Sequence, residues 1–504
     1  MAEQAAPALL WFRQDLRLAD NPALHAAMAG GRPVLPVYIL ESTGRQMGGA
    51  ALWWLHHSLA ALDADLRKHC ANLQNGGLLL LRGDARKLLP KLAKQTGAGA
   101  LHWNRRYDAE GIAIDTEVKT LLKAKGLEVE SHNGALLREP WEIRNQSGSW
   151  FKVFTPFWRA CQQAAPIAAS LPAPKKLKLA ALPDGDALPD WKLLPQKPDW
   201  ASGLRASWKP GEVNAAAMLT DFLDHRIKGY AQNRDRPDLP ATSRLSPYLH
   251  FGEISPRQIL HAARMREDAG SAPPGDLAKF LAELGWREFS HHLLFHFPDL
   301  PRSNFRPEFD AFPWRSDAKL QKIWQRGRTG YPIVDAGMRE LWHTGWMHNR
   351  VRMIVASFLV KHLGQDWRAG EAWFWDTLVD ADAANNAASW QWVAGSGADA
   401  APYFRIFNPV LQGERFDPAG AYIRHWLPEL AALPNDWLHK PWAAPDSVLR
   451  AAKLALGRDY PQPVVDHATA REKALAAFAA LRDKEDGGSG RKAAGKSRIR
   501  GVSV

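Results

Sequence analysis

The chain has 504 residues, more than one hydrophobic core usually supports, so two or three domains are expected. Lys and Arg number 65 against 53 Asp and Glu, a net charge of +12 that favours a polyanionic partner, with a solvated lysine-rich surface as the alternative. Only Cys70 and Cys161 are present, which excludes a disulfide framework and a cysteine-rich metal site. Met1–Leu16 lacks the pattern of a signal peptide and no apolar run reaches membrane-spanning length, so we expect a soluble cytoplasmic protein.

Residues 1–133 are expected to form a doubly wound α/β domain around a parallel sheet. Short apolar runs alternate with helical patterns, which is typical of that architecture. The expected strands are Pro7–Phe12, Pro33–Ile39, Leu78–Leu81 and Leu101–Trp103, and the expected helices are Gly49–Cys70, Ala85–Gln95 and Ala109–Lys125. No G-x-G-x-x-G or Walker A loop follows the first strand, so the sheet is not an obvious dinucleotide or triphosphate site.

Residues 134–210 are expected to connect two domains. From Ala164 to Pro210 the sequence is rich in proline and lysine, while Trp191 and Trp200 indicate that this stretch docks on the protein surface. Residues 211–482 show helical periodicity without strand signals and predict a large all-helical domain. Residues 487–504 carry five basic residues and no acidic one, so a disordered basic tail is expected over residues 483–504.

The stretch Val379–Trp392 is unusually polar for a helix in a helical domain. Read as one helix, it places Asp382, Asn386 and Trp390 on one face. A carboxylate, an amide and an indole together suit a bound ring system such as a flavin or a nucleobase. The alternative is a hydrogen-bonded polar network between helices, and 23 tryptophans against 8 tyrosines favour the flat ligand.

Three further segments combine groups suited to a ligand. Ala241–Pro247 precedes a helix and predicts either a phosphate site or plain capping. Glu283 and Arg287 are spaced one helical turn apart around Trp286, with a surface ion pair beside a core indole as the alternative. Asn349–Met353 places an amide and a thioether on one face between arginines, which suits a phosphate backbone with a ring beyond it. No His, Asp or Glu spacing predicts a metal site.

Several segments together resemble the DNA photolyase and cryptochrome family. They are Leu10–Leu18, Phe154–Phe157, Thr242–Ser246, Trp286–Phe289, Thr329–Ala336, Trp346–Arg350, Trp390–Trp392 and Phe404–Pro409. The similarity runs from about residue 7 to 480 and is greatest to bacterial cyclobutane pyrimidine dimer photolyases of the class III type. It implies an α/β antenna domain and an all-helical FAD-binding catalytic domain.

The resemblance also assigns roles to individual residues. Those that would bind FAD are Tyr230, Thr242, Ser243, Arg244, Leu245, Ser246, Arg287, Arg352, Asp380, Ala381, Asp382 and Asn386, with Asn386 facing flavin N5. The catalytic group would be Glu283, Asn349, Met353 and Asn386, and the dimer would stack on Trp286 and Trp392. Electrons would reach the flavin through Trp314, Trp367 and Trp390, and Arg234, Arg350 and Arg405 would contact DNA. Trp373 and Trp375 suggest a second electron branch, although helix packing explains them better.

The implied activity is a carbon–carbon lyase reaction in which light drives an electron from reduced FAD to a flipped-out pyrimidine dimer. The N-terminal sheet would carry an antenna, expected as 5,10-methenyltetrahydrofolate near Asn104–Glu110, with 8-hydroxy-5-deazaflavin as the alternative. We expect a monomer that acts on nucleoid DNA in the cytoplasm. One alternative is a cryptochrome-type blue-light receptor, which Glu283 beside Trp286 and the short tail disfavour. The other is a nucleic-acid-binding flavoprotein without repair activity, which the basic charge and tryptophan content do not exclude.

Overall fold

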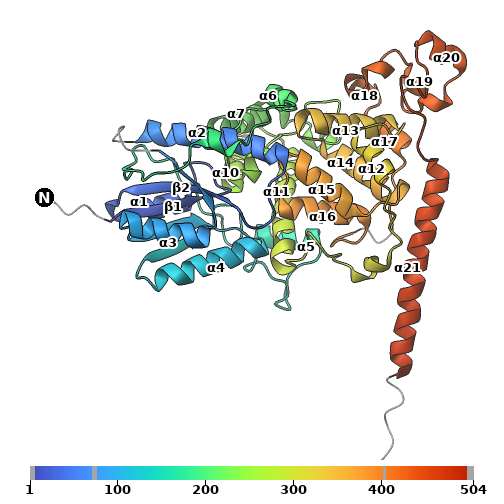
Figure 1. Cartoon of the computed structure of the whole chain (residues 1–504). Coiled ribbons are helices and arrows are strands. Elements are labelled where there is room, and N and C mark those ends of the chain that lie inside the picture. The colour runs from blue at the N-terminus through green and yellow to red at the C-terminus, as the bar shows by residue number, and fades with distance from the viewer. Residues whose placement is uncertain (1–5, 71–76, 401–403, 496–504) are drawn as a thin grey trace, which may run out of the picture.

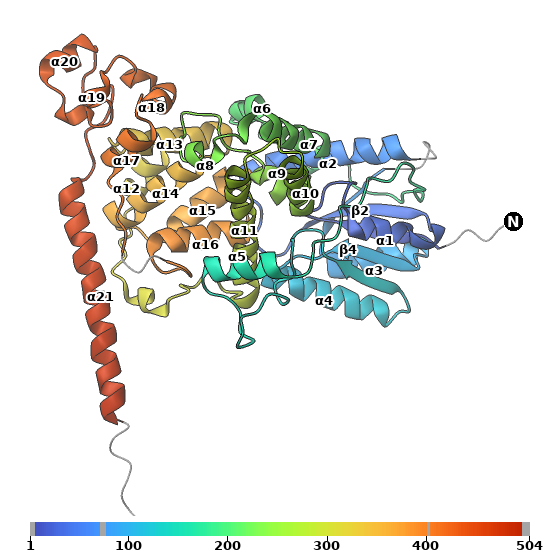
Figure 2. The same ribbon diagram turned by 180° about the vertical axis from the view of Figure 1, so that it is seen from behind.

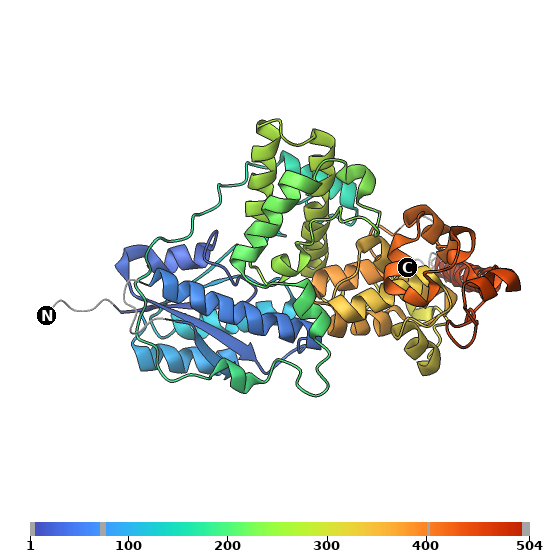
Figure 3. The ribbon, with the colours of Figure 1, turned by 90° about the horizontal axis from the view of Figure 1, so that it is seen from above.

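The computed structural model describes the backbone of residues 6–70, 77–400 and 404–495, and side chains as far as Leu481. A lobe built on a parallel sheet lies beside a larger helical lobe (Figure 1 and Figure 3), which confirms the expected fold class. None of the described helices is long and apolar enough to cross a membrane.

The N-terminal lobe contains one five-stranded parallel sheet in the order β3-β2-β1-β4-β5. Its strands are β1 (Ala8–Phe12), β2 (Val34–Glu41), β3 (Leu79–Gly83), β4 (Ala100–Asn104) and β5 (Glu128–His132). The helices α1 (Pro22–Met28), α2 (Gly49–His69), α3 (Ala85–Thr96) and α4 (Ala109–Lys123) cover its faces. Four strands read as continuous apolar runs because both their faces are buried. Sequence reasoning missed β5, since this edge strand buries only Val129 among charged and polar neighbours.

The segment between the lobes docks on the sheet, as its tryptophans predict. The Val34 amide donates to Lys178 and the Ala180 amide donates to Val34, so the chain adds a short backbone pairing beside β2. Trp191 is 5% exposed and packs against Tyr38. The same segment contains α5 (Phe154–Gln163), η2 (Leu188–Trp191) and α6 (Ser202–Ser207).

The rest of the described chain is helical, as expected. In order the helices are α7 (Glu212–Asp221), η3 (Phe222–Arg226), α8 (Tyr230–Asn233), α9 (Ser246–His250), α10 (Pro256–Asp268), α11 (Pro274–His296), η4 (Pro307–Ala311), α12 (Ala318–Gln325), α13 (Pro332–Thr344), α14 (Asn349–Ser357), η5 (Phe358–His362), α15 (Trp367–Thr377), α16 (Ala383–Ala394), α17 (Pro409–Phe416), α18 (Ala421–Trp426), η6 (Pro428–Leu430), α19 (Asn435–Leu438), η7 (Pro441–Ala443), α20 (Asp446–Ala451) and α21 (His467–Gly495). The first part of helix α21 packs on the helical lobe, where Phe478 stacks on Phe404, and its far end extends beyond both lobes (Figure 1). The helix includes residues 483–495, which were expected in the tail, and residues 496–504 lie outside the described part.

Two carboxylates, one buried and one partly buried, join the two lobes. Glu212 accepts hydrogen bonds from the amides of Leu18 and Ala19, at 2.6 and 2.8 Å. Glu253 accepts from the indole of Trp54 and the hydroxyl of Ser58, both on α2. Each carboxylate is fixed by donors from the sheet lobe, so the helical lobe is held in a defined position.

The polar stretch Val379–Trp392 is not one continuous helix, contrary to the sequence prediction. Helix α16 begins at Ala383, and Asp382 is its N-cap, accepting from the Asn385 amide at 2.7 Å. An Asp side chain satisfies a free amide at a helix start better than a further helical turn would. Asn386 and Trp390 still share a face one turn apart, while Asp380 and Asp382 lie on the segment that leads into the helix.

Candidate functional site

Four neighbouring helices carry most of the expected site residues. Helix α16 packs against α11, α14 and α15 (Figure 1 and Figure 2). Helix α11 contributes Glu283 and Trp286, and α14 begins at Asn349, which is exposed at the helix start with Met353 one turn further on. Segments more than a hundred residues apart in sequence therefore meet around α16.

An aromatic wall forms at α11. The ring of Trp286 stacks on that of Phe154 from α5, with ring centroids 3.7 Å apart and planes within 9°. The indole nitrogen of Trp392 donates to the carbonyl of Asp399 at 3.0 Å, which fixes the plane of the second expected stacking residue. The parallel stack holds the Trp286 plane rigid and leaves this ring partly exposed, as a platform for a flat substrate requires.

Glu283 pairs with Arg234, not with Arg287 as the surface ion-pair alternative proposed. The Arg234 guanidinium donates to Oε1 of Glu283. Arg287 instead donates to the carbonyl of Ala135 at 2.8 Å and lies 3.7 Å from Glu288. Burial raises the pKa of Glu288 to about 7, even though Arg287 and two backbone amides oppose that shift.

Asn386 is held by a carboxylate from the next helix. Its Nδ2 donates to Oε1 of Glu371 at 2.8 Å and to the Glu371 carbonyl at 3.1 Å. Both oxygens of Glu371 also accept from Arg45 of the sheet lobe, each at 2.8 Å. The amide nitrogen of Asn386 therefore donates both of its hydrogen bonds within the protein, and the Asn386 oxygen remains to accept a hydrogen bond from a ligand.

The segment before α16 presents a buried acceptor that needs a partner. Arg352 donates to Oδ2 of Asp380 at 2.8 Å, while Oδ1 of the same carboxylate is buried without a hydrogen bond. An unpaired buried oxygen is costly, so Asp380 fits a bound molecule that donates to its Oδ1.

Arg244, another expected cofactor residue, lies beside two indoles, 4.3 Å from the ring of Trp208 and 5.1 Å from that of Trp346.

Asp382 and His291 form a second polar group beside the same segment. Their nearest atoms are 3.5 Å apart, and both ring nitrogens of His291 are buried without a hydrogen bond. Burial alone would raise the pKa of Asp382, but His291, His250 and Arg287 lower it below its usual range. Orphaned ring nitrogens beside an anionic carboxylate fit the hydroxyl-rich chain of FAD.

The remaining expected cofactor residues lie in three segments, at Tyr230, at residues 242–246 and at Ala381. Tyr230, Leu245 and Ala381 are buried, and Thr242 and Ser243 are partly exposed. Plain capping does not account for the hydroxyls here, because α9 has Leu245 as its N-cap and no side-chain cap bond. Ser246 instead accepts from the Trp346 indole at 3.3 Å, which ties this segment to the loop before α14.

The expected tryptophan path follows α15 and α16. Trp390 is buried directly against the backbone of Gly370 on α15. Trp367, the first residue of α15, is fully buried and donates to Asn304 at 2.9 Å. Trp314 is partly exposed, and the next residue's amide bonds to Gly364 just before α15. The three indoles therefore lie along adjoining segments from the interior toward the surface.

The two extra indoles on α15 have separate surroundings. Trp373 stacks on Trp342, which is 53% exposed, with planes within 6° and centroids 5.9 Å apart. Trp375 donates to the Gln46 carbonyl at 2.8 Å and packs under the guanidinium of Arg45. Trp375 therefore connects the sheet lobe to α15. A second electron branch through Trp373 stays a prediction.

The three arginines expected to contact DNA differ in their surroundings. Arg234 pairs with Glu283, and Arg350 donates to Asp235 at 2.8 Å. Arg405 is exposed on the loop before α17. Contact with DNA stays a prediction for all three.

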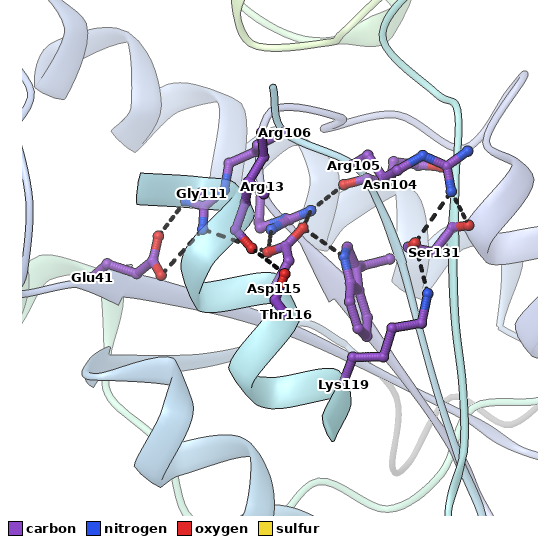
Figure 4. Close-up of polar contacts among 12 residues, drawn as sticks. Arg13, Glu41, Asn104, Arg105, Arg106, Gly111, Asp115, Thr116, Lys119 and Ser131 are labelled. Atoms are coloured by element: carbon purple, nitrogen blue, oxygen red, sulfur yellow. Dashed lines mark hydrogen bonds and ion pairs between the residues drawn. The ribbon is translucent and has the colours of Figure 1, made fainter. Parts of the chain in front are cut away.

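The crevice where the strand order reverses, between β1 and β4, is filled by side chains. Arg13 pairs with Asp115 and Arg106 pairs with Glu41 (Figure 4). The Trp103 indole also donates to Asp115 at 2.8 Å. A crevice of this kind usually binds the ligand of a doubly wound sheet, but here it holds a closed charge network.

A cavity of about 300 Å³ lies beside this network. Its lining includes three arginines, Arg105, Arg138 and Arg257, together with Glu139 and Glu142. Arg105, from the segment in which the antenna was expected, lines this cavity but pairs with Glu139, and its neighbours Asn104 and Arg106 also bond to other side chains. The antenna position stays a prediction.

Sequence reasoning missed several residues of the site. Phe154 was noted only as part of a motif, yet it supports Trp286. Glu371 and Arg45 belong to different lobes, and no spacing in the sequence links them to Asn386. His291 shares α11 with Glu283 two turns away, so its position on the same helix was the available signal.

Comparison with known proteins gives matches over nearly the whole chain. The family model described as DNA photolyase matches residues 8–175, and the one described as the FAD binding domain of DNA photolyase matches residues 280–480. A deoxyribodipyrimidine photo-lyase of Agrobacterium fabrum is 53% identical over 485 residues, which cover 96% of this chain and 99% of that protein. Cryptochrome-2 of Arabidopsis thaliana is 40% identical over 494 residues, covering 95% and 79%.

The crystal structure of a bacterial class III photolyase from Agrobacterium tumefaciens superposes with a TM-score of 0.92 at 52% identity, covering 96% of this chain and 99% of that one. A cryptochrome structure from Synechocystis gives a TM-score of 0.85 at 32% identity, covering 95% and 100%.

Proposed function

Because this chain belongs to the DNA photolyase and cryptochrome family, we propose that it repairs cyclobutane pyrimidine dimers in DNA by light-driven electron transfer from FAD. The observation that carries the proposal is the pairing of Glu283 with Trp286 on one turn of α11, with Trp286 stacked on Phe154 and Glu283 held by Arg234. These groups present a flat apolar face and a polar edge, which match the apolar faces and the polar edge of a pyrimidine dimer.

The substrate must leave the helix to reach this site. Unstacking a nucleotide costs a few kcal/mol, and less when the base is damaged, so a dimer flips out more readily than an intact pair. Trp286 replaces the lost stacking with an aromatic face. Exposed basic residues such as Arg405 would add affinity for the phosphates that depends on salt and not on sequence.

The ion pair with Arg234 refines the role of Glu283. A carboxylate held by a guanidinium only accepts hydrogen bonds, so Glu283 suits the imide N–H groups of the pyrimidine edge. Arg234 supplies the donors that suit the carbonyl oxygens of that edge, where negative charge develops when the dimer gains an electron. The pair would therefore act as a unit.

Asn386, Asp380, Arg352 and Asp382 would hold FAD, which when reduced and excited supplies the electron that splits the dimer. Glu371 fixes the Asn386 amide so that its oxygen accepts from the N–H of a reduced flavin. Asp380 offers its unpaired oxygen to a donor on the cofactor. His291 and Asp382 would bond the hydroxyls of the cofactor chain.

An assay of light-dependent dimer loss tests the proposal. The purified holoprotein, with its flavin reduced, is mixed in the dark with an ultraviolet-irradiated thymine oligonucleotide and then exposed to blue light. Intact thymine should reappear in the light and not in the dark. A flavin-loaded, reduced protein that leaves all dimers in place would favour the blue-light receptor alternative, for which the 40% identity to a plant cryptochrome is the supporting observation.

The antenna forms a separate part of the proposal. A folate carries anionic glutamate carboxylates. In the cavity, Arg105 pairs with Glu139 and Arg257 pairs with Asp20, whereas Arg138 donates to the carbonyls of Cys161 and Ala165, so Arg138 is the cation we propose for such a tail. The closed charge network at the sheet crevice leaves that crevice less suited to a deazaflavin. Denaturing the protein and separating the released chromophores should yield a methenyl folate beside FAD, and release of 8-hydroxy-5-deazaflavin would contradict this assignment.

We further propose a monomer that acts on nucleoid DNA in the cytoplasm. Light scattering after size exclusion should give the mass of one 56.1 kDa chain. A mass of two chains would contradict the monomer.

A further inference from the structure

Two histidines and a glutamate meet on the outer edge of the sheet lobe, away from the flavin site. The parallel register pairs His102 of β4 with Glu130 of β5. His132 follows Glu130 by two residues on the same strand, so both side chains lie on one face of the sheet. Ser131 between them points to the other face, where it contacts Arg105 and Lys119 (Figure 4).

The spacing of the three ligand atoms suits a small metal ion. Nε2 of His132 lies 3.4 Å from Nδ1 of His102 and 4.0 Å from a carboxylate oxygen of Glu130. All three atoms lie within 4.8 Å of one another. Zinc binds imidazole nitrogen at about 2.0–2.1 Å, which places two ligands of a tetrahedral ion about 3.3 Å apart.

A hydrogen bond alone explains the histidine pair poorly. A distance of 3.4 Å is long for a bond between ring nitrogens, yet the two nitrogens face each other. His102 is 3% exposed and so has little freedom to turn away. The Glu130 side chain is 57% exposed and can rotate the short distance that closes the site.

We propose that His102, Glu130 and His132 form a zinc-class metal site, with water as the fourth ligand, that fastens the edge strand β5 to β4. Two imidazoles and one carboxylate are a donor set that zinc accepts. Lys119 and Arg105 oppose a cation here, while Glu130 favours one.

Zinc binding to the flavin-loaded full chain tests the proposal. The protein is stripped with a chelator and dialysed against zinc chloride, and bound metal is then counted by elemental analysis. Wild type should retain one equivalent of zinc, and Glu130→Gln and His132→Ala should retain none. His225→Ala, which removes an exposed histidine on η3, is the matched control and should retain the same equivalent as wild type.

Thermal unfolding gives a second measurement that does not depend on counting the bound metal. Zinc should raise the unfolding midpoint of wild type and leave the midpoints of Glu130→Gln and His132→Ala unchanged, since only the folded site binds the ion. Unaltered flavin absorbance in both variants would show that they fold. Wild type that retains no zinc, or variants that retain as much as wild type, would overturn the proposal.

Discussion

Replacing Trp286 by alanine should weaken binding of damaged DNA selectively. The ring is partly exposed and is stacked on Phe154 with ring centroids 3.7 Å apart, so we expect its other face to receive a flipped base. Stacking of a base on an aromatic side chain contributes about 1–3 kcal/mol, which corresponds to a roughly 5- to 150-fold loss of affinity. Affinity for undamaged DNA, which depends on phosphate contacts, should change little.

Fluorescence anisotropy in the dark measures this effect, with labelled duplexes that carry one thymine dimer or none. Trp286→Phe keeps an aromatic face and should retain most of the affinity. Trp342→Ala is the matched control, because Trp342 also stacks parallel on another ring but belongs to α13. If Trp286→Ala keeps its flavin and binds the dimer duplex as tightly as wild type, Trp286 is not the platform.

Three further predictions concern Glu283, Trp314 and the lobe-joining Glu253. Glu283→Ala should keep FAD but lower repair efficiency roughly tenfold or more, since hydrogen bonds to charged groups contribute about 1.5–3 kcal/mol; unchanged repair would remove Glu283 from the mechanism. Trp314→Phe should block photoreduction of oxidised flavin, followed by absorbance spectra under blue light, while prereduced protein still repairs. Trp442→Phe on η7 is the control, and unchanged photoreduction in Trp314→Phe would exclude this path. Burial raises the pKa of Glu253 from 4.5 to about 8, so the folded protein keeps a proton that the unfolded chain releases. Stability from this group is full at low pH and is lost as pH rises through about 8, and Glu253→Gln should flatten the fall of the thermal midpoint; an equally steep fall in the variant would contradict this.

The sequence predicts the fold wherever local pattern and burial agree. The apolar runs of β1 and β2 and the periodicity of α2 and α3 mark these elements within a residue or two. The pattern fails at β5, where Glu128, Glu130 and His132 line an exposed edge, and at Asp382, where capping replaces the expected helical turn. In both places a side chain's tertiary surroundings outweigh the local signal.

The site residues were predictable where one helix carries them together. Glu283 and Trp286 lie on one turn of α11, and Asn386 and Trp390 on one face of α16. Partners supplied by distant segments were not, since Arg45 reaches Glu371 across 326 positions and Phe154 reaches Trp286 from another helix. Such contacts depend on how the lobes pack, which short-range periodicity does not encode.

The central claim is that a reduced flavin in this chain passes an electron to an extruded pyrimidine dimer. Blue-light pulses on a dark complex of the reduced holoprotein with a dimer oligonucleotide, followed by chromatography of the DNA after each pulse, test it most directly. The account predicts intact thymine pairs accumulating with each pulse, at a rate that falls strongly in Glu283→Ala. Dimers that persist after prolonged light, with flavin bound and reduced throughout, would contradict it.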